Sequence, residues 1–307
     1  MAMTPRDHLR DRARAAYLGL AVGDALGATV EFMTPKEIQH KHGVHKQIIG
    51  GGWLRLRPGH VTDDTTMTLA LGNAILDQGG AIRGDAVARA FDAWMRAKPV
   101  DIGNTVRRGI VEFRRTGDTV RPVNEHEAGN GAAMRLLPAA LVSLGHTETE
   151  VITAILTQAH VTHHNPQSDA CCVTLALMQQ DLLAGQPLAA ARQRAEALAY
   201  DMPAFEFRNK RMENPSGWVV DSFIAVCQAL FATNSFEDCL IDIVNRGGDA
   251  DTTGAIAGML AGAHYGLDAI PRRWLHDLDK KAHADCERQA DQITALIAQP
   301  ALPALAA

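Results

Sequence analysis

The sequence predicts an all-α protein, and three features of its composition and pattern indicate this fold class. Aromatic residues make up only 5% of the 307 residues, while alanine is abundant throughout. Strands are enriched in aromatic and β-branched residues, whereas alanine favours closely packed helices. Segments with apolar residues at helical spacing follow one another along the chain, several of them after a capping residue. Because no linker or repeat divides them, we expect one helical domain over residues 1–298 and a frayed tail at 299–307.

The first helix is expected to begin at Pro5, after a Thr4 cap, and to continue past residue 21 into a glycine-rich end. Gly19, Gly23 and Gly27 recur every four residues within it. This spacing places the three glycines on one helical face, where a neighbouring helix or loop can approach the backbone closely.

The later helices are predicted from the same signals, including a capping box at residues 147–150. A glycine-rich irregular segment at 40–59 and a charged connector at 202–215 interrupt them. The expected helices lie near residues 63–75, 85–97 and 104–115, before 144, from 147 towards 160, and at 169–183, 188–199, 218–232, 236–244, 250–265 and 272–297.

Composition also excludes several classes of protein. The formal net charge is −5 and no long basic run is present, which argues against a general nucleic-acid surface. The five cysteines show no CxxC spacing, so we expect buried thiols in a reducing compartment. The N-terminus is charged where a signal peptide would be apolar, and no apolar run approaches the roughly 20 residues of a membrane span. We therefore expect a cytoplasmic protein without a transmembrane segment.

The most informative stretch is residues 245–254, which reads Asn-Arg-Gly-Gly-Asp-Ala-Asp-Thr-Thr-Gly. Asp249, Asp251, Thr252 and Thr253 precede an apolar run, as at the start of a helix. A cap needs only one such oxygen, and the excess suits a hard divalent cation, although a simple cap is the alternative. An EF-hand loop is excluded because Leu260 stands where that loop needs a bidentate glutamate.

A second cluster of the same chemistry, Thr62-Asp63-Asp64-Thr65, opens the helix near residue 63. Two similar clusters far apart in sequence suggest a shared site. At an effective dielectric constant of about 20, four aspartates brought together would repel one another by several kcal/mol. Divalent cations would remove this repulsion, so we expect a dinuclear centre. Oxygen ligands favour magnesium or manganese over zinc.

Isolated polar residues leave alternatives open. Glu31 could be a carboxylate of the site or a solvated helix-end residue. For Asp101, the pattern alone favours a helix cap over a residue facing a cleft. Three histidines at positions 160, 163 and 164 could bind metal, but such a cluster more often makes hydrogen bonds or ligand contacts.

The polar loop at residues 125–135 matches neither of two familiar motifs. It is not a zinc HExxH motif, because Asn130 takes the place of the second histidine. It is not GxGxxG either, because Met134 replaces the last glycine. A glycine-rich turn before a helix remains, and this is suited to a phosphate without being diagnostic of one.

Taken in order, these motifs resemble those of the ADP-ribosylglycohydrolases. Any one of them is weak, but the ordered set is highly specific and extends from residue 19 to about 265. The matching elements are residues 23–27 (GDALG) with 31–32 (EF), 61–65 (VTDDT), 99–103 (PVDIG), 130–131 (NG) with 134–135 (MR), 162–163 (TH) and 247–254 (GGDADTTG).

The resemblance implies an orthogonal helical bundle around a central cleft with two magnesium or manganese ions. It also implies catalytic roles for Asp101, as acid/base group in place of the cap, and for Glu31. The residues implied to bind metal are Thr62, Asp63, Asp64, Asp249, Asp251 and Thr252, and those implied to bind substrate are Gly103, Asn130, Gly131, His163 and Trp218.

The implied activity is cleavage of the N-glycosidic bond between ADP-ribose and a modified side chain. The branch of the family that the chain resembles most acts on ADP-ribosyl-arginine of dinitrogenase reductase in nitrogen-fixing bacteria, which implies that protein as substrate and a PII signalling protein as candidate partner. The alternatives are another ADP-ribosylated acceptor, a free ADP-ribose derivative, or a non-catalytic relative that binds ADP-ribose. Intact clusters of carboxylates argue against the last of these.

Overall fold

The computed structural model describes residues 4–297, and the regular structure of this part is helical, without strands. The all-α class predicted from the sequence is therefore confirmed, while the tail predicted at 299–307 lies outside the described residues. The helices are α1 (Pro5–Gly27), α2 (Pro35–His42), α3 (Asp63–Asp77), α4 (Gly84–Arg96), α5 (Asn104–Thr116), α6 (Leu137–Val142), α7 (Glu148–Ala159), α8 (Pro166–Leu183), α9 (Leu188–Asp201), η1 (Pro203–Phe205), α10 (Val219–Ala232), α11 (Phe236–Val244), α12 (Ala250–Tyr265), η2 (Leu267–Ala269), α13 (Arg272–Asp277) and α14 (Lys280–Leu296).

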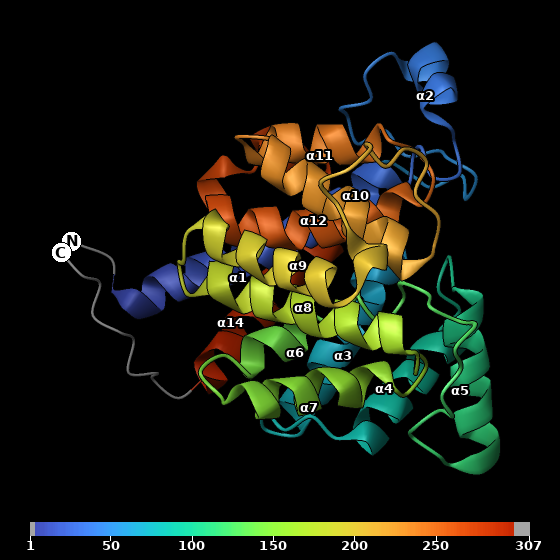
Figure 1. Ribbon diagram of the computed structural model, residues 1–307, viewed down its shortest axis with the longest axis vertical. Coiled ribbons are helices and arrows are strands. Elements are labelled where there is room, and N and C mark those ends of the chain that lie inside the picture. Colours follow the sequence, from blue (N-terminus) through green and yellow to red (C-terminus); the bar gives the residue numbers. More distant parts are fainter. Residues whose placement is uncertain (1–3, 298–307) are drawn as a thin grey trace.

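The centre of the fold is the contact between α1 and α12, which come from opposite ends of the sequence (Figure 1). The glycine face of α1 packs directly on small residues of α12. A Cβ atom added to Gly254 would lie only 2.6 Å from the carbonyl oxygen of Gly23. Gly19 approaches Gly258 in the same way, and Gly27 approaches Ala250. Because no side chains separate these backbones, the two helices bring the end of α1 against the beginning of α12.

Two stretches differ from the helices expected from the sequence. The helix expected over 272–297 is two helices, because Leu278 is extended and the Asp279 side chain caps a new helix by accepting from the backbone of Lys281 and Ala282. Helix α2 was not expected, although its Thr34 forms a capping box with Glu37. Its signal is short and lies beside a glycine-rich segment, where apolar periodicity is weak.

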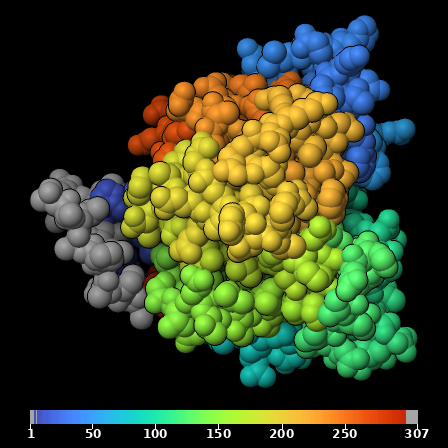
Figure 2. Space-filling view, in the orientation of Figure 1, coloured from blue at the N-terminus to red at the C-terminus, as the bar shows by residue number. Residues whose placement is uncertain are grey.

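Helices α2 and α5 lie on the same side of the molecule in the view of Figure 1. Helix α2 projects from the body on that side, and α5 forms a separate corner below it (Figures 1 and 2). The segment between α2 and α3 contains a tight turn in which Gly51 and Leu56 form an isolated β-bridge. A second isolated bridge joins Gly129 to Trp218.

Two further expectations concern the environment of the protein. All five cysteines are free and buried, as expected for small core residues. Among the described helices, none combines the length and apolar character that a membrane span requires.

Candidate metal centre and active site

The two Asp/Thr clusters meet where the N-termini of α3 and α12 face each other. The hydroxyl of Thr62, the residue before α3, lies 3.0 Å from Oδ2 of Asp64 and 3.5 Å from Oδ2 of Asp251. Neither Thr62 nor Asp249 uses its side chain to cap its own helix. The simple cap alternative therefore does not explain these side chains, which face one another across the two helix ends.

Asp24 of α1 holds this arrangement together, and it was not among the predicted site residues. Its carboxylate accepts the backbone N–H groups of Thr62 and Thr65 and lies within hydrogen-bond distance of both hydroxyls. Burial raises the pKa of Asp24 to about 6, and these hydrogen bonds oppose the rise. Asp24 thus ties the first turn of α3 to α1. The sequence signal for this role is a single aspartate within the stretch of small apolar residues near the end of α1.

The carboxylates of the site are buried together without basic partners. Burial, followed by the negative charge of Asp101 and Asp24, raises the pKa of Asp63 to about 7. Burial likewise raises the pKa values of Asp64 and Asp251 well above their usual range, with further contributions from neighbouring carboxylates. Within residues 4–297, no ion pair joins any of these aspartates to a lysine, arginine or histidine. Their charges therefore need another source of neutralisation.

The donor set fits a hard divalent cation. Carboxylate oxygens of Glu31, Asp249 and Asp251 lie within 4.8 Å of one another, as in a group that can hold a metal ion. Oδ1 of Asp64 is buried and has no hydrogen-bond partner. An unsatisfied buried carboxylate oxygen is unfavourable, and a cation would satisfy it. Oxygen ligands of this kind suit magnesium or manganese.

Glu31 follows the end of α1 and is buried beside the aspartates, so it is not a solvated helix-end residue. Burial raises its pKa to about 8, and the charges of Asp249 and Asp101 add to this rise. One oxygen of Glu31 accepts the indole N–H of Trp53 at 2.5 Å. Trp53 was not predicted as part of the site, because its contact with Glu31 depends on the path of a long loop.

Asp101 does not cap α5, because the residue in the cap position is Gly103. The Asp101 carboxylate instead accepts the backbone N–H of Ile102 at 2.7 Å. Half-burial raises the pKa of Asp101, and the charge of Asp249 contributes in the same direction. The cap interpretation is therefore wrong, and Asp101 lies close enough to the cluster to interact with it electrostatically. Gly103 is exposed beside it.

Asn130 links the glycine-rich loop to the acidic cluster. Its side-chain amide donates to Oδ2 of Asp249 at 2.7 Å and to the hydroxyl of Ser222 at 2.9 Å. Its backbone N–H donates to the carbonyl of Gly217, next to Trp218. Trp218 is 43% exposed and donates its indole N–H to Gln167.

His163 packs against the same loop, since a Cβ added to Gly131 would lie 3.0 Å from Cε1 of His163. Burial lowers the pKa of His163 to about 3, so its imidazole is neutral. The buried guanidinium of Arg135 donates to the Thr162 hydroxyl at 2.8 Å, and that hydroxyl lies 2.8 Å from Nδ1 of His163. The Thr162 hydroxyl therefore lies within hydrogen-bond distance of both the Arg135 guanidinium and Nδ1 of the His163 imidazole.

The three histidines do not act as one group. His160 and His164 stack on each other, and with Asp169 they form a second group whose ligand atoms lie within 4.8 Å. His163 packs against the glycine-rich loop instead. Metal binding stays the less favoured alternative, and it concerns only His160 and His164, whose rings contact Asp169 and the carbonyl of Arg121.

The described structure brings together the predicted metal residues at the α3 and α12 N-termini, with Glu31, Asp101 and Asn130 around them. It adds Asp24 and Trp53 to this set. The individual roles given to these residues stay predictions.

Comparisons with known proteins agree with this geometry. The family model described as ADP-ribosylglycohydrolase matches residues 5–302. The ADP-ribosyl-[dinitrogen reductase] glycohydrolase of Rhodospirillum rubrum is 49% identical over 288 residues, covering 94% of this chain and 97% of that protein. The ADP-ribosylarginine hydrolase Tri1 of Pseudomonas putida is 32% identical over 317 residues, covering 96% of this chain and 83% of that protein.

A solved structure, described as an ADP-ribosylglycohydrolase-related protein complex, has the same fold. It superposes with a TM-score of 0.82 at 33% identity and covers 94% of this chain and 99% of its own. The resemblance inferred from the sequence motifs is confirmed, and with it the class of activity, hydrolysis of an ADP-ribosyl linkage. The chain belongs to the ADP-ribosylglycohydrolase family.

Proposed function

We propose that this protein removes ADP-ribose from a modified arginine side chain of a target protein and so reverses mono-ADP-ribosylation. The observation that carries the proposal is the buried cluster of unpaired carboxylates at the facing N-termini of α3 and α12. The similarity to the ADP-ribosylarginine hydrolase Tri1 of Pseudomonas putida supports arginine as acceptor. The similarity to the ADP-ribosyl-[dinitrogen reductase] glycohydrolase of Rhodospirillum rubrum supports dinitrogenase reductase as the target. A PII protein, expected from the resemblance, is proposed as a regulatory partner, and the cytoplasm as the compartment.

Two divalent cations, magnesium or manganese, are proposed as cofactors. The residues that would hold them are Thr62, Asp63, Asp64, Asp249, Asp251 and Thr252, with Glu31 beside them. Bound divalent cations would supply Lewis acidity, orient ribose hydroxyls and water, and neutralise the carboxylates. The orphaned oxygen of Asp64 and the raised pKa values of Asp63 and Asp251 support this ligand set.

The residues around the cluster would transfer protons and bind the substrate. Asp101, half-buried with a raised pKa, is suited to exchange a proton at the ribose while the arginine leaves. Glu31 is the second carboxylate with a raised pKa at this edge. The neutral imidazole of His163 would hydrogen-bond the nucleotide beside Asn130 and Gly131. Trp218 is exposed enough to stack on a ring, and Gly103 leaves space beside Asp101.

The test is release of ADP-ribose from an arginine-ADP-ribosylated protein with manganese, with magnesium and after chelation. Metal-dependent release is expected for the native protein and for Asp268→Ala, a control at an exposed aspartate outside the site. Asp249→Ala should lose both release and tight metal binding. Asp101→Ala should bind metal normally but lose turnover. Intact turnover in a metal-replete Asp101→Ala protein would exclude the acid/base role.

A native protein that binds ADP-ribose but does not cleave the arginine linkage would contradict the proposal. In that case substrates with other acceptors, and free ADP-ribose derivatives, would separate a different hydrolase from a non-catalytic ADP-ribose-binding protein.

A further inference from the structure

Two large aromatic side chains are exposed next to each other at the edge of the site. Phe32 is 64% exposed and Trp53 is 51% exposed. Their ring centroids are 5.4 Å apart and their planes are inclined at 48°. Phe32 directly follows Glu31 in the chain, and Trp53 hydrogen-bonds Glu31. The exposed pair, called here the aromatic shelf, therefore adjoins the acidic cluster.

Phe32 is held in a backbone conformation that is unfavourable for a non-glycine residue. Its φ is 61°, in the left-handed region, where the Cβ of a non-glycine residue approaches the backbone too closely. The backbone N–H of Phe32 donates to the carbonyl of Gly248 at 2.7 Å, which ties it to the residue before Asp249. A strained backbone and an exposed ring at the same residue indicate a requirement other than stability.

Trp53 is presented by a turn that is braced against α1. The turn closes through two hydrogen bonds between Gly51 and Leu56, of 2.8 and 2.9 Å. Gly52 has a φ of 67°, and a Cβ added there would overlap the carbonyl oxygen of Ala28. Because this turn packs on the end of α1, the indole N–H is directed at Oε2 of Glu31.

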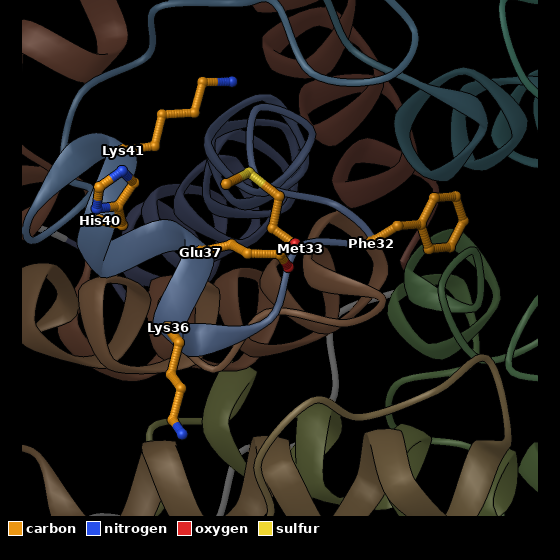
Figure 3. A pocket seen from close by; sticks show the side chains of 6 residues that line it. All are labelled: Phe32, Met33, Lys36, Glu37, His40 and Lys41. Atoms are coloured by element: carbon orange, nitrogen blue, oxygen red, sulfur yellow. The ribbon is translucent and has the colours of Figure 1, made fainter.

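Phe32 also borders a groove of about 660 Å³, but that groove has the wrong charge for a cation. Its lining from α2 carries Lys36, His40 and Lys41 against one carboxylate, that of Glu37, so it has more basic than acidic groups. Figure 3 shows the ring of Phe32 pointing away from these three side chains. The side of Phe32 that meets Trp53 instead adjoins Glu31 and the acidic cluster.

We propose that the aromatic shelf of Phe32 and Trp53 is the subsite for the guanidinium group of the arginine from which ADP-ribose is removed. This deepens the proposed function and depends on it for the identity of the acceptor. A guanidinium is a planar cation that stacks on aromatic faces and is attracted by nearby carboxylates. Exposed rings beside unpaired carboxylates provide both interactions. Trp53 also acts as a positioning residue, because its N–H fixes Glu31 at the junction between the shelf and the cluster.

The test compares Trp53→Ala, Trp53→Phe and Phe32→Gly with the native protein on an arginine-ADP-ribosylated peptide. Trp53→Ala and Phe32→Gly should raise KM between about threefold and thirtyfold, the range expected for loss of a cation–π contact. Trp53→Phe keeps a ring but loses the N–H, so it should change KM less and lower kcat about tenfold. Phe32→Gly should not lower stability, because glycine relieves the left-handed strain.

The affinity for free ADP-ribose, measured by calorimetry with magnesium, should stay within about twofold of the native value in all three variants. Tyr200→Ala, which removes an exposed aromatic from α9, is the control and should change neither KM nor kcat. An unchanged KM in both Trp53→Ala and Phe32→Gly would overturn the proposal. A parallel loss of ADP-ribose affinity would also overturn it, since the shelf would then support the nucleotide or the fold.

Methylguanidinium binding separates this proposal from the proposed function. Added to the magnesium-loaded protein, it should change the tryptophan fluorescence of the native protein but not of Trp53→Phe. If the native protein does not cleave arginine linkages but shows this difference, the proposed function fails, while the shelf stands as a guanidinium-binding site without the role in arginine release. If cleavage occurs without any Trp53-dependent fluorescence change, the proposed function stands and the subsite is refuted.

Discussion

Replacing Gly254 with alanine tests whether the site depends on direct backbone contact between α1 and α12. The added Cβ would lie 2.6 Å from the carbonyl oxygen and 3.1 Å from the carbonyl carbon of Gly23. Ordinary contacts of this kind are about 3.5 Å, so the helices would have to separate by nearly 1 Å. Neither obstructing atom can rotate away, because both belong to the α1 backbone.

The expected loss of stability follows from two opposing effects. Overpacking against a rigid neighbour costs about 3 kcal/mol, the upper part of the usual range. Alanine in place of glycine within a helix returns about 1 kcal/mol. The net change in the free energy of unfolding is therefore about 2 kcal/mol. An unfolding entropy of about 2.1 cal/mol/K per residue converts this into a Tm lower by about 3 °C for a chain of 307 residues.

Gly72→Ala in α3 is the matched control. The three atoms nearest to its Cβ would all belong to the amide end of the buried Gln289, a side chain that can change its rotamer at the expense of two hydrogen bonds. The same gain in helix propensity offsets part of that loss, so stability should fall by about 1 kcal/mol, less than in Gly254→Ala. Thermal and urea unfolding of both variants measure the difference. A Gly254→Ala protein at least as stable as Gly72→Ala would refute the close contact.

Three further predictions follow from the charged groups. Asp24→Asn should lower the free energy of unfolding by about 2–3 kcal/mol, because an amide nitrogen would face the donors at the start of α3. Urea titrations measure this loss, and equilibrium dialysis should show weaker metal binding. Unchanged metal binding would contradict the anchoring role of Asp24. In the chelated protein, the pKa values of Asp63 and Glu31 are raised to about 7 and about 8, so the folded state holds more protons than the unfolded state. The free energy of unfolding should therefore fall as pH rises from about 4 to 8 and recover when manganese is added. A free energy of unfolding that stays constant across that window would count against the raised values. Asp291→Asn should cost only about 1 kcal/mol at neutral pH, since its ion pairs with two arginines of α1 are partly exposed. This difference should begin to shrink as pH falls below 3.8 and vanish only once the folded-state carboxylate is protonated at lower pH, because those arginines lower its pKa in the folded state. A difference that stays constant between pH 7 and pH 2 would contradict this assignment.

Part of the site could be predicted because its signals are local. The clusters at residues 62–65 and 249–253 are recognisable because cap positions, oxygen ligands and the following apolar run lie within a few residues of one another. The spacing of Gly19, Gly23 and Gly27 similarly predicts a face for close approach. Such patterns report which oxygens are available and where a helix can be approached, without naming the partner.

Other features depend on residues that are far apart in the chain. Asp24 and Thr62 are 38 residues apart, and Asn130 and Asp249 are 119 apart. The sequence alone favours a cap role for Asp101, and it does not show that His163 is separated from His160 and His164. In both cases the partner of a side chain depends on which surface its helix end contacts. The division of the last predicted helix at Leu278 arises in the same way, since the Asp279 backbone N–H bonds Gly59 in a distant loop.

By itself, the sequence determined the helical class, the family and the two clusters of candidate ligand oxygens, because each depends on local spacing and composition. Only the tertiary structure decided that α12 is the partner of the α1 glycine face, that Asp24 anchors α3, and that Trp53 reaches Glu31. The physical reason is that these contacts arise when surfaces of distant segments pack together. The energy of that packing depends on the shapes of the surfaces and the distance between them, and a local sequence pattern specifies neither.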